Sequence, residues 1–168
     1  MFTICATGHR PDKLPGGYDI YSAENANLIK KMQEILLISY YNIHGALHCI
    51  TGMALGIDQL FAIACIGLKQ MYNLNITIEA AVPCIGQESK WPASSQALYN
   101  SLLETMDSVY YVTQAPYTAG CMELRNEYMV DNSDLVLAYF NGSKGGTKNC
   151  IDYAKEQDKE IINIYMLN

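Results

Sequence analysis

Apolar and polar positions along the chain of 168 residues form two alternating patterns. Short, continuously apolar runs are typical of buried β-strands, and longer stretches with apolar residues at helical spacing are typical of amphipathic helices. The predicted strands are residues 2–7, 48–51, 76–82, 108–113, 135–140 and 160–166. The predicted helices are residues 22–43, 56–72, 94–105, 121–130 and 147–157, and Ser22 is the predicted N-cap of the first.

Strands that alternate with helices indicate an α/β fold, because each helix can serve as the crossover between two parallel strands. We expect a three-layer sandwich with a mostly parallel central sheet, formed by residues 1–168 as a single domain. In such folds ligands bind outside the carboxyl ends of the strands, where the direction of chain progression switches.

Three of the predicted strands end in a glycine-bearing turn that leads into a helix or loop. These turns are Thr7 to Pro11, Thr51 to Asp58, and Asn141 to Lys148. Glycine lets backbone N–H groups approach a ligand closely, and a helix N-terminus favours negative charge. We therefore expect the turns to meet at one sheet edge and to form a cleft for a phosphate-bearing small molecule.

The candidate ligand-binding residues come from these turns, from one aromatic loop and from the two arginines of the chain. Arginine presents a planar fork that suits phosphate or carboxylate, although two arginines can also fall near a site by chance. The candidates are Thr7, Gly8, His9, Arg10, Gly52, Met53, Ala54, Gly56, Asp58, Lys90, Trp91, Arg125, Gly145, Gly146 and Thr147.

Several of these candidates also have a purely structural interpretation. Asp58 either orients its loop or binds a ribose hydroxyl, or it simply caps a helix. Thr147 is a candidate N-cap within an anion site, or part of an ordinary tight turn. His9 is either a catalytic group or a hydrogen-bonded structural residue. Trp91 either stacks on a nucleobase, as Tyr18, Tyr21 or Tyr117 also could, or anchors its loop on the core.

Composition narrows the class of partner. The formal net charge is -6 and the sequence pI is about 4.9, which opposes broad nucleic-acid binding. The six cysteines form no C-x-x-C pair, so we expect no disulfide framework, no metal site and a cytoplasmic location. No apolar run reaches membrane-spanning length, and we expect neither a leader peptide, nor a membrane partner, nor a cofactor.

Five segments carry motifs in a distinctive order and spacing. They are Thr7-Gly8-His9-Arg10-Pro11 with Lys13-Leu14, Gln87-Glu88-Ser89-Lys90-Trp91, the loop from Tyr117 into Glu123-Leu124-Arg125-Asn126, Val130-Asp131-Asn132-Ser133-Asp134, and Tyr139-Phe140-Asn141-Gly142 with Lys144-Gly145-Gly146-Thr147-Lys148. Together they resemble the YspA/YpsA-like branch of the SLOG superfamily, which also includes the Lonely Guy nucleotide hydrolases and the DNA-processing protein DprA.

This resemblance implies a Rossmann-like fold, a pocket for nucleotides or nucleotide-derived ligands, and self-association into a homo-oligomer. Lonely Guy enzymes carry a P-G-G-x-G-T-x-x-E pattern whose glutamate supports N-glycosidic cleavage. Cys150 stands at the corresponding position here, so we favour a binding protein over an enzyme.

Three functional hypotheses follow. In the first, the protein binds an ADP-ribose-type or cyclic-nucleotide signal as a sensor or a sequestering, sponge-like protein. In the second, it is a hydrolase of N-glycosidic or phosphoester bonds, with Glu88, Asp58 or Glu123 replacing the missing glutamate. In the third, it binds single-stranded DNA as DprA does, which its acidic balance opposes.

Overall fold

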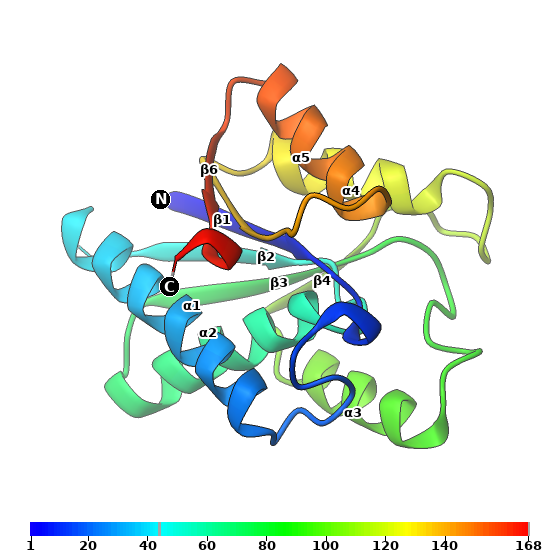
Figure 1. The fold of residues 1–168 in the computed structure, drawn as a ribbon, viewed down its shortest axis with the longest axis horizontal. Helices are drawn as coiled ribbons and strands as arrows, with labels where there is room; N and C mark the ends of the chain where they lie inside the picture. The colour runs from blue at the N-terminus through cyan, green and yellow to red at the C-terminus, as the bar shows by residue number, and fades with distance from the viewer. Residues whose placement is uncertain (44, 168) are drawn as a thin grey trace.

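The computed structural model describes residues 1–43 and 45–167. Its centre is a six-stranded sheet in the order β4-β3-β2-β1-β5-β6, with every neighbouring pair parallel (Figure 1). The strands are β1 (Phe2–Gly8), β2 (Leu47–Thr51), β3 (Ile76–Val82), β4 (Ser108–Tyr111), β5 (Leu135–Tyr139) and β6 (Glu160–Asn163). The predicted mostly parallel sheet is confirmed, and its paired strands all run in one direction.

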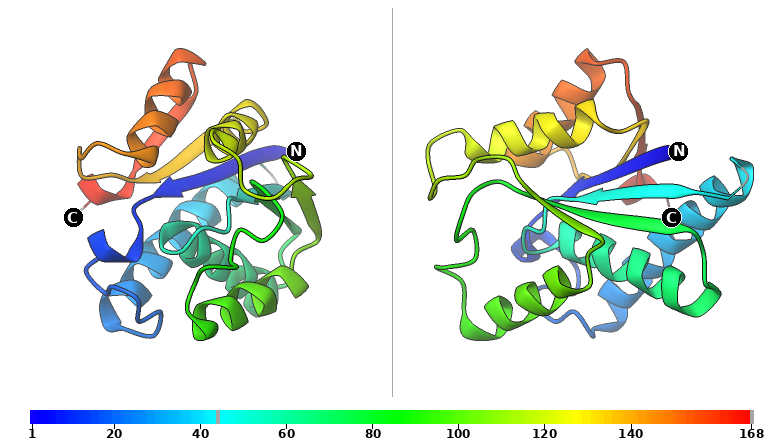
Figure 2. Two further views of the ribbon diagram at one scale, coloured as in Figure 1. Left: turned by 90° about the vertical axis from the view of Figure 1, so that its right-hand side faces the viewer. Right: turned by 180° about the vertical axis from the view of Figure 1, so that it is seen from behind.

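Helices cover the two faces of the sheet unequally. A group of helices lies on each face, as all three views show (Figure 1, Figure 2). The first face carries α1 (Ala23–Asn42), α2 (Ile57–Tyr72) and α3 (Ala93–Glu104), and the second carries α4 (Cys121–Asp131) and α5 (Gly146–Glu156). This arrangement is the predicted Rossmann-like three-layer sandwich. None of the helices in the described part of the chain is long and apolar enough to cross a membrane.

The order of the strands locates the switch point. The chain proceeds from β1 outward through β2 and β3 to β4, then returns to place β5 on the other side of β1. In the register of these two strands Gly8 lies opposite Tyr139, so the loops that follow β1 and β5 leave the sheet side by side. A ligand site is expected at this position in a doubly wound sheet.

Each helical layer has its own apolar core. The larger core lies between the sheet and the first helical face and is centred on Phe61, Met32 and Leu36, all of which are fully buried. The smaller core lies under α4 and α5 and includes Cys5 and Val136. Because strands β1 and β5 are buried on both faces, their carboxyl ends form a rigid base for the loops above them.

Local hydrogen bonds explain where the elements begin and end. Ser22 caps α1 as predicted, because its side chain accepts a hydrogen bond from the Asn25 N–H. The prediction that the last strand reaches residue 166 is wrong. The Asn163 side chain accepts from the Tyr165 N–H, and a short 3-10 helix over Ile164–Met166 replaces the end of the strand. A second short 3-10 helix, Pro11–Lys13, follows β1.

Candidate functional site

A cavity of about 230 Å³ lies between the loops that follow β1 and β5. We call it the anion cavity. Its described lining residues are His9, Arg10, Asp12, Lys13 and the run Ser143–Thr147. Three of its side chains are basic and one is acidic, although the chain as a whole is acidic. The Lys13 ammonium donates to the Ser143 hydroxyl over 3.0 Å and so joins the two loops across the cavity.

The N-terminus of α5 opens into the anion cavity. Gly145 is the N-cap with φ 140°, a conformation that L-residues rarely adopt, and no side chain caps the helix. The prediction that Thr147 is the N-cap is therefore wrong. The first N–H groups of an α-helix have no partner within the helix, and the dipole gives them partial positive charge. A Cβ atom on Gly146 would meet no heavy atom within 4 Å, so the space beside these amides is open.

His9 holds the β5–α5 loop in place. Its Nε2 lies 2.8 Å from Asn141 Oδ1 and 3.1 Å from the Asn141 backbone N. The residue is only 4% exposed, and its ring packs edge-on against Tyr139. One ring nitrogen serves one of these contacts at a time, because it donates to Oδ1 when it carries the proton and accepts the Asn141 N–H when it carries the lone pair. This arrangement fits the structural interpretation of His9, in which it positions the loop that carries the amides.

We expect the unfolding free energy to fall as the pH drops below 6.5, the ordinary pKa of histidine. Burial lowers the pKa of His9, as does Lys13, while Asn141 and Asp12 oppose the shift. Between the two pKa values the unfolded chain binds a proton that the folded chain does not, so acid favours unfolding. Denaturant titrations from neutral to mildly acidic pH should show this slope.

A His9→Gln variant should lose that slope, because glutamine keeps a polar side chain and does not titrate. His48→Gln is the matched control and should keep it. An unchanged slope in His9→Gln would show that other groups produce the pH dependence.

The turn that follows β2 is already occupied by the protein itself. The Met53 N–H donates to Thr51 Oγ1 over 3.3 Å, and the Ala54 N–H donates to Asp58 Oδ2 over 3.3 Å. The helix behind the turn, α2, begins at Ile57 with Gly56 as its N-cap, so Asp58 is a first-turn residue and not the N-cap. Its carboxylate stands where an external anion was expected, which supports the loop-orienting interpretation of Asp58.

Arg125 completes this occupied turn. Its Nη1 lies 3.0 Å from Asp58 Oδ2, and both side chains are 7% exposed. A Cβ atom on Gly52 would lie 1.5 Å from Nη1, so only glycine leaves room for the guanidinium. Burial raises the pKa of Asp58, and Arg125 and Arg10 oppose the shift. Arginine stays protonated in proteins, so the buried guanidinium needs the carboxylate.

The glycines of the first two turns serve close packing between those turns. A Cβ atom on Gly8 would lie 2.5 Å from the Ile57 side chain, and one on Gly56 would lie 2.4 Å from the His9 carbonyl oxygen. The Ile57 N–H also donates to that carbonyl over 3.3 Å. The structure thus brings the turns after β1 and β2 into direct contact. This close packing requires glycine at both positions, whether or not a ligand is bound.

Cys150 lies below the anion cavity in the first turns of α5. It is 1% exposed, and burial raises the pKa of its thiol, while a hydrogen bond with Thr7 opposes the shift. Thr7 is itself only 6% exposed. A second cavity of about 240 Å³ between α4 and α5 is lined by both Cys150 and Glu123. Glu123 is therefore a hydrolytic candidate that lines the same cavity as Cys150.

The loop that carries Lys90 and Trp91 lies apart from the anion cavity. The Trp91 ring packs edge-on against Tyr99 of α3 at 5.4 Å between centroids, within an apolar cluster on that helix. Lys90 is exposed and Glu88 is half-buried, and neither lines the anion cavity. The arrangement favours the interpretation in which Trp91 anchors its loop on the core.

Five residues near the anion cavity were not among the candidates. They are Asp12, Lys13, Asn141, Ser143 and Lys144. All except Asp12 and Ser143 belong to the motif segments quoted above, which is the signal that could have identified them. Gln87 was also missed as a partner of the occupied turn, where its Nε2 lies 3.4 Å from the Gly52 carbonyl oxygen.

Two solved structures share this fold. The DNA processing protein A (DprA) of Streptococcus pneumoniae superposes with a TM-score of 0.62 at 14% identity, over 96% of this chain and 49% of that one. The DprA of Helicobacter pylori was solved for its single-stranded DNA binding mode. It superposes with a TM-score of 0.59 at 14% identity, over 95% of this chain and 63% of that one. This chain therefore spans about half of the first protein and less than two thirds of the second.

Two other proteins have higher sequence identity to this chain than the two DprA structures have. The SPbeta prophage-derived protein YoqJ of Bacillus subtilis is 33% identical over 118 residues, 64% of this chain and 68% of YoqJ. A UPF0398 protein of Halalkalibacterium halodurans is 30% identical over 164 residues, 95% of this chain and 84% of that protein. The sequence model of the YspA SLOG family matches residues 4–168. With the fold and the glycine-bearing turns described above, this match shows that the chain belongs to the YspA SLOG family.

Proposed function

We propose that this protein binds a nucleotide-derived small molecule, an ADP-ribose-type or cyclic-nucleotide signal, and acts in the cytoplasm as a sensor or a sequestering protein. The observation that carries the proposal is the anion cavity. It joins the uncapped N-terminus of α5 to Arg10, Lys13 and Lys144 at the switch point of the sheet. Backbone amides at a helix N-terminus together with basic side chains form a characteristic phosphate site.

The size of the cavity supports a ligand that is only partly enclosed. Its volume of about 230 Å³ lies below the range of roughly 300–1,000 Å³ that is typical of sites for whole drug-sized ligands. A phosphate group fits this space, and the remainder of a nucleotide must extend beyond it. The positive cavity on an acidic protein also favours a small anion over a polyanionic strand.

Binding without turnover is favoured by the groups around Cys150. A buried thiol with a raised pKa is a poor general acid or base at neutral pH. The buried Arg125 guanidinium is already paired with Asp58. The alternative of a nucleotide hydrolase depends on Glu123, which lines the cavity beside Cys150.

Single-stranded DNA is a second candidate ligand, favoured by the fold shared with the Helicobacter pylori DprA. A gel-shift experiment at low salt tests it directly. Retention of labelled single-stranded DNA by this acidic chain would favour it, and free migration of the DNA would exclude it.

Isothermal titration with ADP-ribose, AMP, GMP and cyclic AMP tests the proposal. We expect at least one of them to bind more tightly than millimolar and to be recovered intact by chromatography. Recovery of cleaved ligand would favour the hydrolase, and no binding by any of them would contradict the proposal. Mass spectrometry of ligand released from protein purified out of cells would identify the physiological molecule, and size-exclusion chromatography would test the proposed homo-oligomer.

A further inference from the structure

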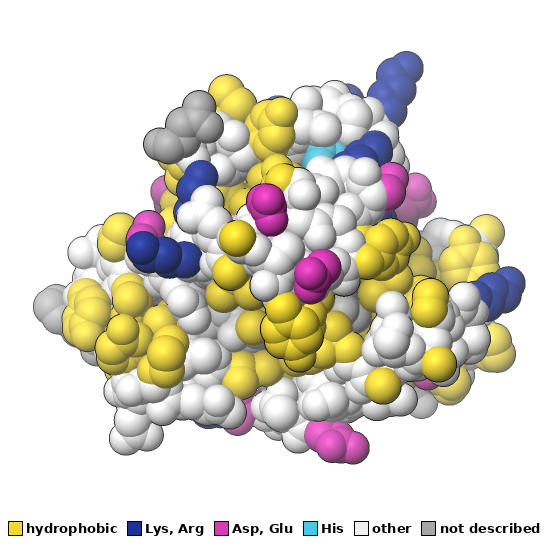
Figure 3. Space-filling model, turned by 60° about the horizontal axis from the view of Figure 1, so that its bottom comes forward, with side chains coloured by type: hydrophobic (Ala, Val, Ile, Leu, Met, Phe, Trp, Pro, Cys, Tyr) yellow, Lys and Arg dark blue, Asp and Glu magenta, His cyan; other side chains and the backbone are white. Residues whose placement is uncertain are grey.

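A groove lies between residues 18–21 and residues 94–101 of α3. It has a volume of about 440 Å³, and its inner end is a small enclosed space against α2. We call it the Tyr18 slot. Figure 3 looks toward the side covered by α1, α2 and α3, where hydrophobic side chains reach the surface near the centre and Lys and Arg lie toward the edges. The volume of the Tyr18 slot falls within the range of roughly 300–1,000 Å³ typical of small-molecule sites.

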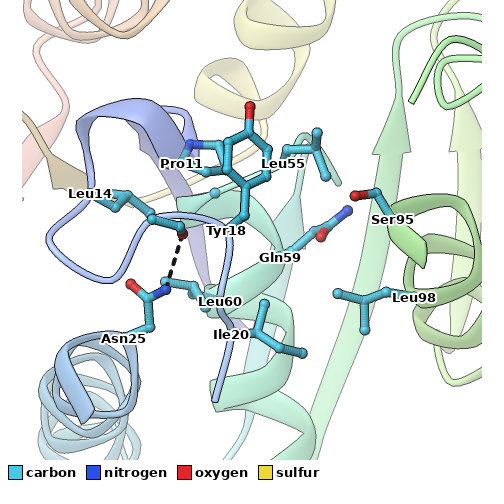
Figure 4. A pocket seen from close by; sticks show the side chains of 12 residues that line it. Pro11, Leu14, Tyr18, Ile20, Asn25, Leu55, Gln59, Leu60, Ser95 and Leu98 are labelled. Atoms are coloured by element: carbon cyan, nitrogen blue, oxygen red, sulfur yellow. Dashed lines mark hydrogen bonds between the residues drawn. The ribbon is translucent and has the colours of Figure 1, made fainter. Parts of the chain in front are cut away.

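The slot combines apolar walls with polar groups and an aromatic side. Ile20 and Leu98 face each other across it, and Gln59 and Ser95 point toward each other above them (Figure 4). The Gln59 amide is fixed because its Nε2 donates to the Met53 carbonyl over 3.3 Å. Gln59 is 2% exposed and lines only the inner end, which has a volume of about 30 Å³. In the groove itself, Ile20, Leu98 and the Ser95 hydroxyl suit a flat heterocycle, which offers apolar faces and polar edges.

Charge divides the slot from the anion cavity. Among the described residues that line the slot, Asp19 is the one charged residue, and its carboxylate accepts a hydrogen bond from the Tyr21 N–H over 2.9 Å. The anion cavity, in contrast, holds Arg10, Lys13 and Lys144. A ligand with an anionic end and an uncharged aromatic end complements this pair of sites.

The backbone at Arg10 and Pro11 separates the anion cavity from the inner end of the slot. Arg10 lines the anion cavity and the next residue, Pro11, lines the inner end of the slot. Gly56 lies on the slot side, and a Cβ atom there would be 3.1 Å from the Arg10 Cα atom. Consecutive residues thus line the two sites, and the exposed Arg10 lies at the junction between them.

The wall that carries Tyr18 is held in place before any ligand binds. Asn25 Nδ2 donates to the Gly17 carbonyl over 3.2 Å, drawn as the dashed line in Figure 4, and to the Asp19 carbonyl over 2.8 Å. A Cβ atom on Gly16 would lie 2.5 Å from the Asn25 side chain, so the loop closes tightly over α1. A fixed wall lowers the entropic cost of binding.

We infer that the Tyr18 slot binds the uncharged heterocyclic base of the ligand whose phosphate occupies the anion cavity. The inference rests on the proposed function and specifies it. Another aromatic candidate, Trp91, packs edge-on against Tyr99 and does not line the slot. Tyr18 is 66% exposed and lies along the slot, where its ring can stack on a base.

The test compares base-bearing and base-free probes by isothermal titration. The base-bearing probe is whichever of ADP-ribose, AMP and GMP binds the wild type most tightly, and the base-free probe is pyrophosphate. Tyr18→Ala should weaken the base-bearing probe by about tenfold through lost stacking and leave pyrophosphate binding unchanged. Tyr41→Ala is the matched control, because Tyr41 is also 66% exposed but lies on α1 outside the slot. It should change neither affinity.

A second pair of variants changes residues of α3, inside and outside the slot. Ser95→Trp fills the slot and should weaken the base-bearing probe, whereas Asn100→Trp, at an exposed α3 position outside it, should not. If the base-bearing probe binds wild type, Tyr18→Ala and Ser95→Trp equally, the slot assignment is overturned and the anion cavity stands. If the wild type binds no phosphate-bearing probe at all, the proposed function and this inference both fail.

Discussion

Replacement of Arg125 by methionine should destabilise the protein by about 3–5 kcal/mol, the typical cost of leaving one partner of a buried ion pair uncompensated. Asp58 and Arg125 are joined at 3.0 Å with 7% of each side chain exposed. Without the guanidinium, the buried Asp58 carboxylate keeps the Ala54 N–H as its one hydrogen-bond donor among the described residues. Chemical denaturation of Arg125→Met measures the loss.

Lys69→Met is the matched control. Lys69 pairs with Asp107, but about a third of each side chain is exposed, at 37% and 36%. Exposed ion pairs contribute about 0–1 kcal/mol, so this variant should be nearly neutral. The double variant Arg125→Met with Asp58→Asn should recover part of the stability, because it removes the unpaired charge. Equal losses in Arg125→Met and Lys69→Met would show that the buried pair does not hold the β2 turn together.

Gly146→Asp should weaken binding of phosphate-bearing ligands by about 100-fold, the equivalent of losing one or two charge-assisted hydrogen bonds. A carboxylate at this position occupies the open space beside the α5 amides and repels the phosphate. The fold should not suffer, because an acidic residue in the first turn of a helix is stabilising by about 0.3–1 kcal/mol. Loss of affinity with an equal or higher melting temperature is the expected result by titration and calorimetry.

Asn149→Asp provides the matched control for charge. It adds the same carboxylate to α5 at an exposed position that does not line the anion cavity. Affinity should change less than about twofold, since exposed charges are screened by salt. Similar losses in both variants would point to a general effect of net charge instead of a local anion site.

Gly52 is not suitable for the same test, although the sequence presents it as an equivalent cradle glycine. Any side chain at Gly52 collides with the Arg125 guanidinium, so loss of binding would be confounded with loss of folding. Gly52 and Gly146 look alike in sequence. They differ because Gly52 contacts Arg125, a residue far along the chain, and Gly146 has open space beside it.

The strands could be predicted from the sequence because burial on both faces produces continuous apolar runs. The start of the first helix could be predicted because the Ser22 side chain caps it locally. The common edge of the glycine-bearing turns followed from parallel pairing alone. Local patterns did not show where the last strand ends, since Asn163 stops it through a side-chain hydrogen bond to the Tyr165 N–H.

Local sequence could not predict which side chains of the protein itself fill or hold each turn. Arg125 and Asp58 are separated by 67 positions, and their pairing fills the β2 turn. His9 and Asn141 are separated by 132 positions, and their contact determines how the β5 loop is held. Such pairs depend on strand order, which hydrophobic periodicity does not specify.

Proton–nitrogen NMR spectra of the labelled protein, recorded during titration with ADP-ribose, AMP and GMP, test the central claim most directly. A saturable response should be largest at the amides of Gly145, Gly146 and Thr147 and at Arg10, which surround the anion cavity. Saturable shifts confined to the cavity between α4 and α5, with the Gly146 amide unmoved, would contradict the account, as would the absence of any saturable shift.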